Sequence, residues 1–123
     1  MTMLEAIGRL DQLKPNAFSR EQKALWLSAL EELIHRFRGN YREQAPPFTP
    51  FTPDTDPDTR LLLPAAYENC YLYWLEAQLH YANEDISRYN AAITLFRSAF
   101  DDYCRHYHRT HTPKDPGDFQ FRR

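Results

Sequence analysis

The chain has 123 residues, a mass of 14.7 kDa and a formal net charge of −2. This length supports one hydrophobic core and is too short for two ordinary domains, so we predict a single domain. The mean hydropathy of −0.72 excludes a membrane span, and a pI of about 6.2 gives no overall electrostatic attraction to nucleic acid.

Two capping patterns open the first two predicted helices. Thr2 followed by Glu5 has the spacing of a capping box, and a short helix is expected from there to the break at residues 14–15. Ser19 followed by Gln22 repeats the arrangement before a second helix of about twenty residues, which ends at Gly39. The apolar residues of this second helix recur at helical spacing, and they are Trp26, Leu27, Leu30, Leu33, Ile34 and Phe37.

A proline-rich segment follows at residues 44–60. Its closely spaced prolines are incompatible with a helix, so we expect an extended surface loop. Phe48 and Phe51 are large apolar side chains in this otherwise polar segment, and they are candidates to anchor it on the core or on a neighbouring subunit. Loops longer than the usual connections within a domain are often functional or disordered.

The C-terminal half predicts two helices joined by a tight turn. Pro64 favours a helix start, and the third helix is expected over about Ala65–Ala82, with enough apolar residues to be covered on more than one side. Asn83 is the expected left-handed cap. The fourth helix should run from Ile86 to about His108, because large apolar residues alternate at spacings of three and four: Ile86, Tyr89, Ile93, Phe96, Phe100, Tyr103 and Tyr107.

These elements predict an all-α fold. Residues 1–112 should form one small helical bundle, with a short N-terminal helix, a second helix, the proline-rich loop and a C-terminal antiparallel helical hairpin. Residues 113–123 are expected to be a flexible tail. The hairpin is rich in tyrosine, which suits both the edge of a core and an interface between subunits, so both interpretations stay open.

No residue pattern points to an enzyme, a cofactor or a metal. Three glycines are too few for a phosphate-binding loop, and adjacent acidic pairs such as Glu31-Glu32 point in different directions on a helix, so we expect them on a solvated surface. Cys70 and Cys104 are expected to be small buried side chains and not a disulfide. Cys104, His106, His108 and His111 lie close enough in the sequence to offer ligands to zinc. We favour the interpretation that these histidines are surface residues.

Several segments together resemble a known family. They are residues 3–6, 13–16, 58–64, 71–81, 88–90 and 107–113, with Tyr67, Phe96, Ala99, Phe100 and Tyr103. In this combination of aromatic and polar residues, the chain resembles small proteins encoded beside portal and capsid genes in tailed phages and prophages, the head-tail connector or adaptor proteins. Similar chains tend to carry Asn-Gly-Glu in the hairpin turn, where this chain has Asn83-Glu84-Asp85. We therefore expect the turn to shift onto Asn83, or the two helices to run on with a kink.

The resemblance implies a structural protein of virion assembly. Such subunits form a homo-oligomeric ring beneath the portal protein, bind a tail-side connector or stopper protein, and let DNA pass without sequence-specific contacts. No active site, cofactor or membrane is implied. The expected location is the virion, assembled in the cytoplasm of the bacterial host, which agrees with the lack of a secretory signal pattern at the N-terminus.

Aromatic and basic residues are the candidates for an interface between subunits. They come from the loop, the hairpin and the tail, and they are Phe48, Phe51, Tyr73, Arg105, His108, Arg109, His111, Phe119 and Phe121. The basic residues near the end of the last helix keep one alternative open, namely a small helical regulatory module that binds DNA or a protein.

Overall fold

The structure is a computed structural model of the chain, and it describes residues 1–41 and 46–114. Over these residues the chain is all-helical and contains no β-strand, so the predicted all-α fold class is confirmed. The helices are α1 (Met3–Leu13), α2 (Arg20–Arg38), the short 3₁₀ helix η1 (Ala65–Tyr67), α3 (Asn69–Ala82) and α4 (Ile86–Thr110).

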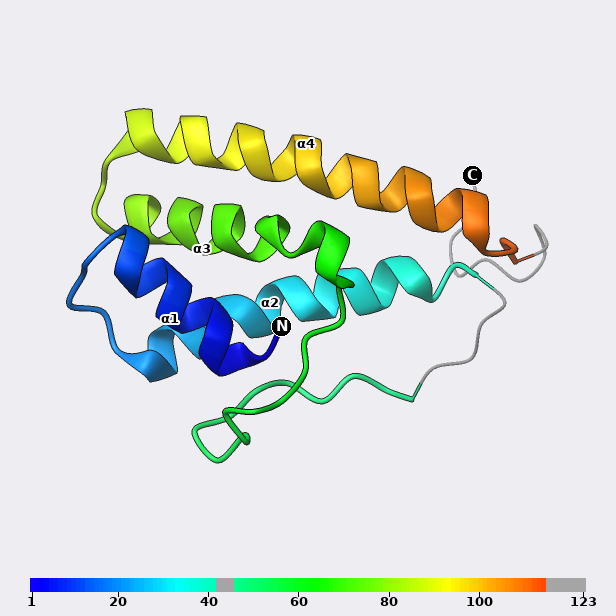
Figure 1. Cartoon of the computed structure of the whole chain (residues 1–123), viewed down its shortest axis with the longest axis horizontal. Helices are drawn as coiled ribbons and strands as arrows, with labels where there is room; N and C mark the ends of the chain where they lie inside the picture. The colour runs from blue at the N-terminus through cyan, green and yellow to red at the C-terminus, as the bar shows by residue number, and fades with distance from the viewer. Residues whose placement is uncertain (42–45, 115–123) are drawn as a thin grey trace.

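Helix α3 is the centre of the bundle. It contacts each of the other α-helices, with α4 along one side and α1 and α2 along the other (Figure 1). Its buried residues accordingly occupy more than one face of the helix, as the sequence predicted: Cys70, Tyr71, Leu75, Ala77, Leu79 and His80. A short α-helix with this many buried positions depends on tertiary packing for its stability.

The first two predicted helix starts are confirmed at atomic detail, whereas the third helix begins later than predicted, since residues 65–67 form η1 and α3 starts at Asn69. The Thr2 hydroxyl accepts a hydrogen bond from the Glu5 amide at 3.2 Å, and the Glu5 carboxylate accepts one from the Thr2 amide at 2.8 Å, which completes the capping box. The Ser19 hydroxyl accepts from the Gln22 amide at 3.1 Å in the same manner. Helix α2 ends next to Gly39, its C-cap.

The loop carbonyls complete the N-terminus of α1. The first amides of a helix have no partner within it, and here the Met3 amide donates to the Thr59 carbonyl at 2.9 Å. The Leu4 amide likewise donates to the Pro57 carbonyl at 3.0 Å, and Thr2 forms an isolated antiparallel bridge with Arg60. The second half of the loop is therefore fixed along the start of α1.

The prediction for the turn at residues 83–85 was wrong by one position. Asn83 has a φ of −85°, and Glu84, with a φ of 59°, takes the left-handed conformation. The Glu84 amide donates to the Tyr81 carbonyl at 3.0 Å and the Asp85 amide to the His80 carbonyl at 2.9 Å. This is the Schellman motif, whose left-handed residue follows the C-cap, so the hydrogen bonds select Glu84 although it lacks the freedom of glycine.

The large apolar residues of α4 that recur at spacings of three and four, from Ile86 to Tyr107, form its apolar ladder. This ladder is buried only where α2 and α3 cover it. Ile93, Phe96, Tyr103 and Tyr107 are buried, but Ile86 is 56% exposed. Tyr81, at the end of α3, is 62% exposed as well. Both residues lie beside the turn, so Ile86, the first residue of the ladder, lies beyond the part of α4 that the other helices cover.

A buried carboxylate joins α2 to α3 and to the end of the loop. Glu31 is only 2% exposed, which corrects the prediction of a solvated Glu31-Glu32 pair. Its carboxylate accepts a hydrogen bond from the Leu62 amide at 2.8 Å and a short one from the Tyr71 hydroxyl, and that hydroxyl accepts from the Leu63 amide at 2.9 Å. Burial raises the pKa of Glu31, although the hydrogen bond from Tyr71 acts in the opposite direction.

Arg38 connects this set of hydrogen-bonded residues to α4. Its Nη2 donates to the Leu62 carbonyl and its Nε to the Tyr103 hydroxyl, each at 2.8 Å. The guanidinium carbon lies 5.5 Å from the centre of the Tyr107 ring, within cation–π range. Residues 61–63 are consequently held by side chains of α2 and α3, and Arg38 connects them to Tyr103 of α4.

We expect replacement of Glu84 by glycine to stabilise the protein. Glycine adopts the left-handed conformation without the steric cost of a Cβ atom, so the Glu84→Gly variant should gain about 1 kcal/mol in free energy of unfolding. Urea unfolding measures this gain. Glu84→Ala keeps the Cβ atom and is the matched control, and an equal gain in both variants would show that the backbone conformation is not the cause.

We also expect Glu31 to make stability depend on pH. Between the ordinary glutamate pKa of about 4.5 and the raised pKa of Glu31, the folded chain retains a proton that the unfolded chain has lost. The free energy of unfolding of the native protein should therefore fall, relative to that of Glu31→Gln, as the pH rises from about 4.5 through this range. Urea titrations across these pH values test the sign, and a constant difference between the two proteins would contradict it.

Candidate functional site

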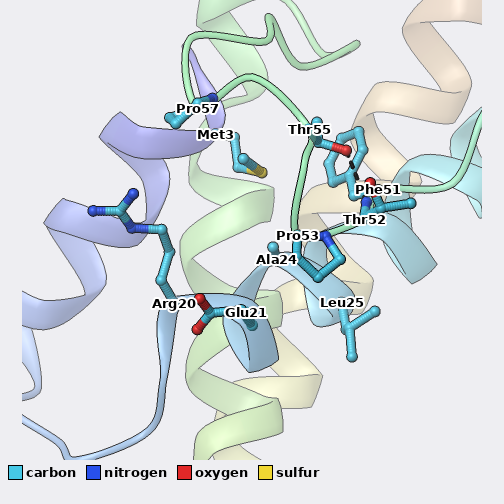
Figure 2. A pocket seen from close by; sticks show the side chains of 10 residues that line it. All are labelled: Met3, Arg20, Glu21, Ala24, Leu25, Phe51, Thr52, Pro53, Thr55 and Pro57. Carbon is cyan, nitrogen blue, oxygen red and sulfur yellow. Dashed lines mark hydrogen bonds between the residues drawn. The ribbon is translucent and has the colours of Figure 1, made fainter.

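The surface is hollowed where the proline-rich loop crosses α1 and the start of α2. We call this place the loop hollow; its volume is about 130 Å³. Figure 2 shows its lining, with Arg20 and Glu21 on one side and residues 51–53 on the other. The lining residues are Met3, Arg20, Glu21, Ala24, Leu25, Phe51, Thr52, Pro53, Thr55 and Pro57.

Three buried side chains from different segments form the apolar part of the loop hollow. Met3 comes from α1, Ala24 from α2 and Phe51 from the loop. Leu25, which is 55% exposed, extends this apolar surface to solvent. The hollow therefore presents a continuous apolar surface that is accessible from outside.

Hydrogen bonds shape the loop around the hollow. The Phe51 amide donates to the Ser28 hydroxyl at 3.0 Å, which fixes Phe51 on α2. The Thr52 amide donates to the Thr55 hydroxyl at 2.7 Å and the Thr55 amide to the Thr52 carbonyl at 2.9 Å, so residues 52–55 close into a turn (Figure 2). Pro53 lies within this turn and is held at the edge of the hollow.

The lining of the loop hollow is mainly apolar. It contains no His, Cys, Ser or Lys, and its hydroxyl and carboxylate groups are those of Thr52, Thr55 and Glu21. The thiols of the chain lie elsewhere, and burial raises the pKa of both Cys70 and Cys104 to about 11, which keeps them protonated and poorly reactive at neutral pH. An apolar group of a ligand or partner is what this hollow can accommodate.

A second group of residues gathers where α2 and α4 end. The rings of Phe37, Tyr41 and Tyr107 pack against one another with centroid distances of 4.9–5.5 Å. The Lys114 amide donates to the Asn40 carbonyl at 3.0 Å, and Pro113 forms an isolated bridge with Tyr41. The first two residues of the segment predicted as a flexible tail are thus paired, and residues 115–123 lie outside the described residues.

The predicted interface residues do not form one site. Phe51 is buried, so of its two predicted roles the anchor on the core of its own chain is the one that the structure supports. Phe48 is half-buried, with its ring 6.3 Å from that of Phe51 and 6.0 Å from that of His35. Tyr73 is half-buried on another side of the molecule, in a hollow that also includes Tyr67 and Ala99.

The basic residues predicted for the interface lie at the C-terminal end of α4 or just after it. Arg105 is exposed and pairs with Asp102 at 2.9 Å, which raises the pKa of its guanidinium through that hydrogen bond. Arg109 and His108 are exposed, and the Nδ1 atom of His108 lies 3.1 Å from the Tyr41 hydroxyl. His111 is stacked on Tyr107 at a centroid distance of 3.7 Å. Phe119 and Phe121 lie outside the described residues.

The loop hollow was missed in the sequence because its lining residues come from three distant segments. The prolines of the loop were the available signal, since they predicted an extended chain with fixed φ angles. They did not show which helices this chain would cross. Ala24 and Leu25 come just before the apolar residues that predicted α2. Nothing in their spacing indicates an exposed hollow.

Two further findings concern the described part of the chain. Among those residues, no three or more His, Cys, Asp or Glu side chains come close enough together to hold a metal ion. Within the same residues, no helix combines the length and apolar character needed to cross a membrane.

No model of a protein family, no curated protein and no solved structure matches this chain.

We expect Phe51 to hold the loop in place. The Phe51→Ala variant removes a buried ring from the contact between the loop and α2, and its free energy of unfolding should fall by roughly 3 kcal/mol. Trypsin should then cut faster after the exposed Arg60. Phe48→Ala is the matched control, with an expected loss of about 1 kcal/mol because its ring is half-buried. Equal effects of the two substitutions would contradict this role.

Proposed function

We propose that this protein is an adaptor subunit of a phage virion, which joins the portal of the head to the tail as part of a ring. In this proposal its partners are the portal protein, a tail-side connector or stopper protein, and further copies of itself. DNA passes through the ring without sequence-specific contacts. Assembly takes place in the cytoplasm of the bacterial host, and the subunit remains in the virion.

The residues that carry the resemblance to adaptor proteins are also residues that hold this chain together. Leu62 lies in the segment 58–64 and bonds both Glu31 and Arg38, while Tyr71 begins the segment 71–81 and bonds Glu31. Tyr107 and Pro113 delimit the last segment and contact Tyr41. The segments that carry the resemblance therefore include residues that join the helices of this chain, which supports the proposal of a shared framework of proline-rich loop and antiparallel hairpin.

The observation that supports the proposed ring is the presence of exposed apolar residues on two separate faces of the bundle. Leu25 and Leu33 are 55% and 40% exposed on α2, and Leu95 is 51% exposed on α4. Helix α3 lies between α2 and α4 over most of their length (Figure 1). A ring of identical subunits uses two different surfaces of each copy, so two apolar faces on one small bundle fit a head-to-tail contact.

Co-assembly with the purified portal protein tests this function. We expect electron microscopy to show a ring of this protein on the portal. Leu95→Glu should abolish the ring and leave the helical content unchanged, because it places a charge on one of the two apolar faces. Ser98→Glu, at another exposed position of α4, is the matched control and should still assemble.

The opposite outcome favours the regulatory alternative. Its basis is the exposed basic end of α4, at Arg105, His108 and Arg109. If the protein fails to associate with the portal and instead binds duplex DNA tightly at physiological salt, with a steep salt dependence, the adaptor function is wrong.

A further inference from the structure

The loop hollow has the size and lining of a site for one aromatic ring. A closed apolar cavity of about 150 Å³ is known to hold a benzene molecule, and the loop hollow measures about 130 Å³. Met3, Ala24 and Phe51 supply buried apolar surface, and Leu25 and Pro53 border the opening. A phenylalanine side chain of a partner fits this description.

The chain itself supplies two candidate phenylalanines. Of its eight phenylalanines, six lie in the described residues, and each of these six has an aromatic ring of the same chain as a neighbour: Phe18, Phe37, Phe48, Phe51, Phe96 and Phe100. The other two are Phe119 and Phe121, in the C-terminal segment after Lys114. That segment ends in Phe-Gln-Phe-Arg-Arg.

The position of Lys114 makes occupation of the hollow by the same copy costly in conformational entropy. The Lys114 amide bonds the Asn40 carbonyl, just beyond the end of α2, whereas Ala24 lies near its start. Along the helix this separation is roughly 24 Å. A fully extended chain from Lys114 carries the Cα of Phe119 at most about 18 Å, and Phe121 about 25 Å only with complete loss of conformational freedom.

A second copy of the chain can supply the C-terminal segment without this limit on distance. Lys114, the last described residue, lies at the end of the bundle where α2 and α4 finish (Figure 1). The loop hollow is lined by residues from the start of α2. A contact between these two places joins different surfaces of two identical chains. This is the heterologous geometry that a closed ring requires.

The charges around the two partners are complementary. Arg122 and Arg123 follow Phe121 directly. Arg20 and Glu21 both belong to the lining of the hollow and offset each other in charge, so the acidic character comes from three exposed aspartates of the adjoining loop, Asp54, Asp56 and Asp58. Opposite charges on the two surfaces favour this orientation of the segment and disfavour its reversal.

We propose that residues 119–121 of one copy dock in the loop hollow of the next copy, with a phenylalanine ring between Ala24, Phe51 and Leu25. Arg122 and Arg123 then face the acidic loop. The inference rests on the proposed ring function and specifies the contact that closes the ring.

A titration of the full-length protein with a fluorescent peptide of residues 113–123 tests this contact. We expect saturable binding by fluorescence anisotropy, and a loss of at least tenfold in affinity when both phenylalanines of the peptide are replaced by serine. Leu25→Lys in the protein should cause a similar loss, because it places a positive charge at the exposed opening of the hollow. Ala29→Lys introduces the same charge at an exposed position of α2 outside the hollow and should bind normally.

Several results would overturn the proposal. In the titration they are the absence of saturable binding, equal binding of the serine peptide, and equal losses for Leu25→Lys and Ala29→Lys. If the Leu25→Lys variant no longer binds the portal protein but still binds the peptide, the hollow is a binding site for the portal, and the proposal is also wrong. The titration contains no portal, so peptide binding without a ring on the portal contradicts the adaptor function alone. Rings that survive the serine substitutions in the full chain contradict this inference alone.

Discussion

The buried carboxylate of Glu31 is the constraint on which the rest of the structure depends. A charged or polar group removed from water is costly unless hydrogen bonds replace its hydration. Here the replacements are the Leu62 amide and the Tyr71 hydroxyl, from a loop residue and from α3. Helix α2 can bury Glu31 only if the chain returns to it after the proline-rich loop, so this one side chain fixes the path of a long connection.

The path of the loop in turn creates the loop hollow. With residues 61–63 held at Glu31 and Phe51 held at Ser28, the segment between them must cross the start of α1 and α2. On the way its carbonyls accept the free amides of Met3 and Leu4. The hydrogen bonds that satisfy the first turn of α1 therefore also place Pro53 and Pro57 around an apolar depression.

This arrangement suits a protein that acts by contact. Its described polar groups are used mainly to hold segments together: Glu31 and Arg38 bind the loop, and Tyr41 binds the residues that follow α4. Exposed apolar side chains lie on α2 and α4, on either side of the central helix, and also on α1, at Leu4 and Leu13, and at the end of α3, at Tyr81. A rigid bundle with two such faces is suited to repeated contacts with copies of itself, which is what an adaptor ring needs.

The sequence by itself determined the positions of the helices. Caps at Thr2 and Ser19, the break at the prolines and the spacing of apolar residues are local features, and local hydrogen bonds and helical periodicity are enough to interpret them. The Schellman turn shows the limit of this approach, because Asn83 and Glu84 are adjacent and the hydrogen bonds to His80 and Tyr81 decide between them.

Only the tertiary structure decided which side chains are covered. Glu31 is buried although its neighbour Glu32 is accessible, and Ile86 is exposed although it continues a buried ladder. The loop hollow also exists only because Met3, Ala24 and Phe51 meet from three segments. Burial depends on neighbours that are distant in the chain, and a periodic pattern contains no information about which segment will lie against it.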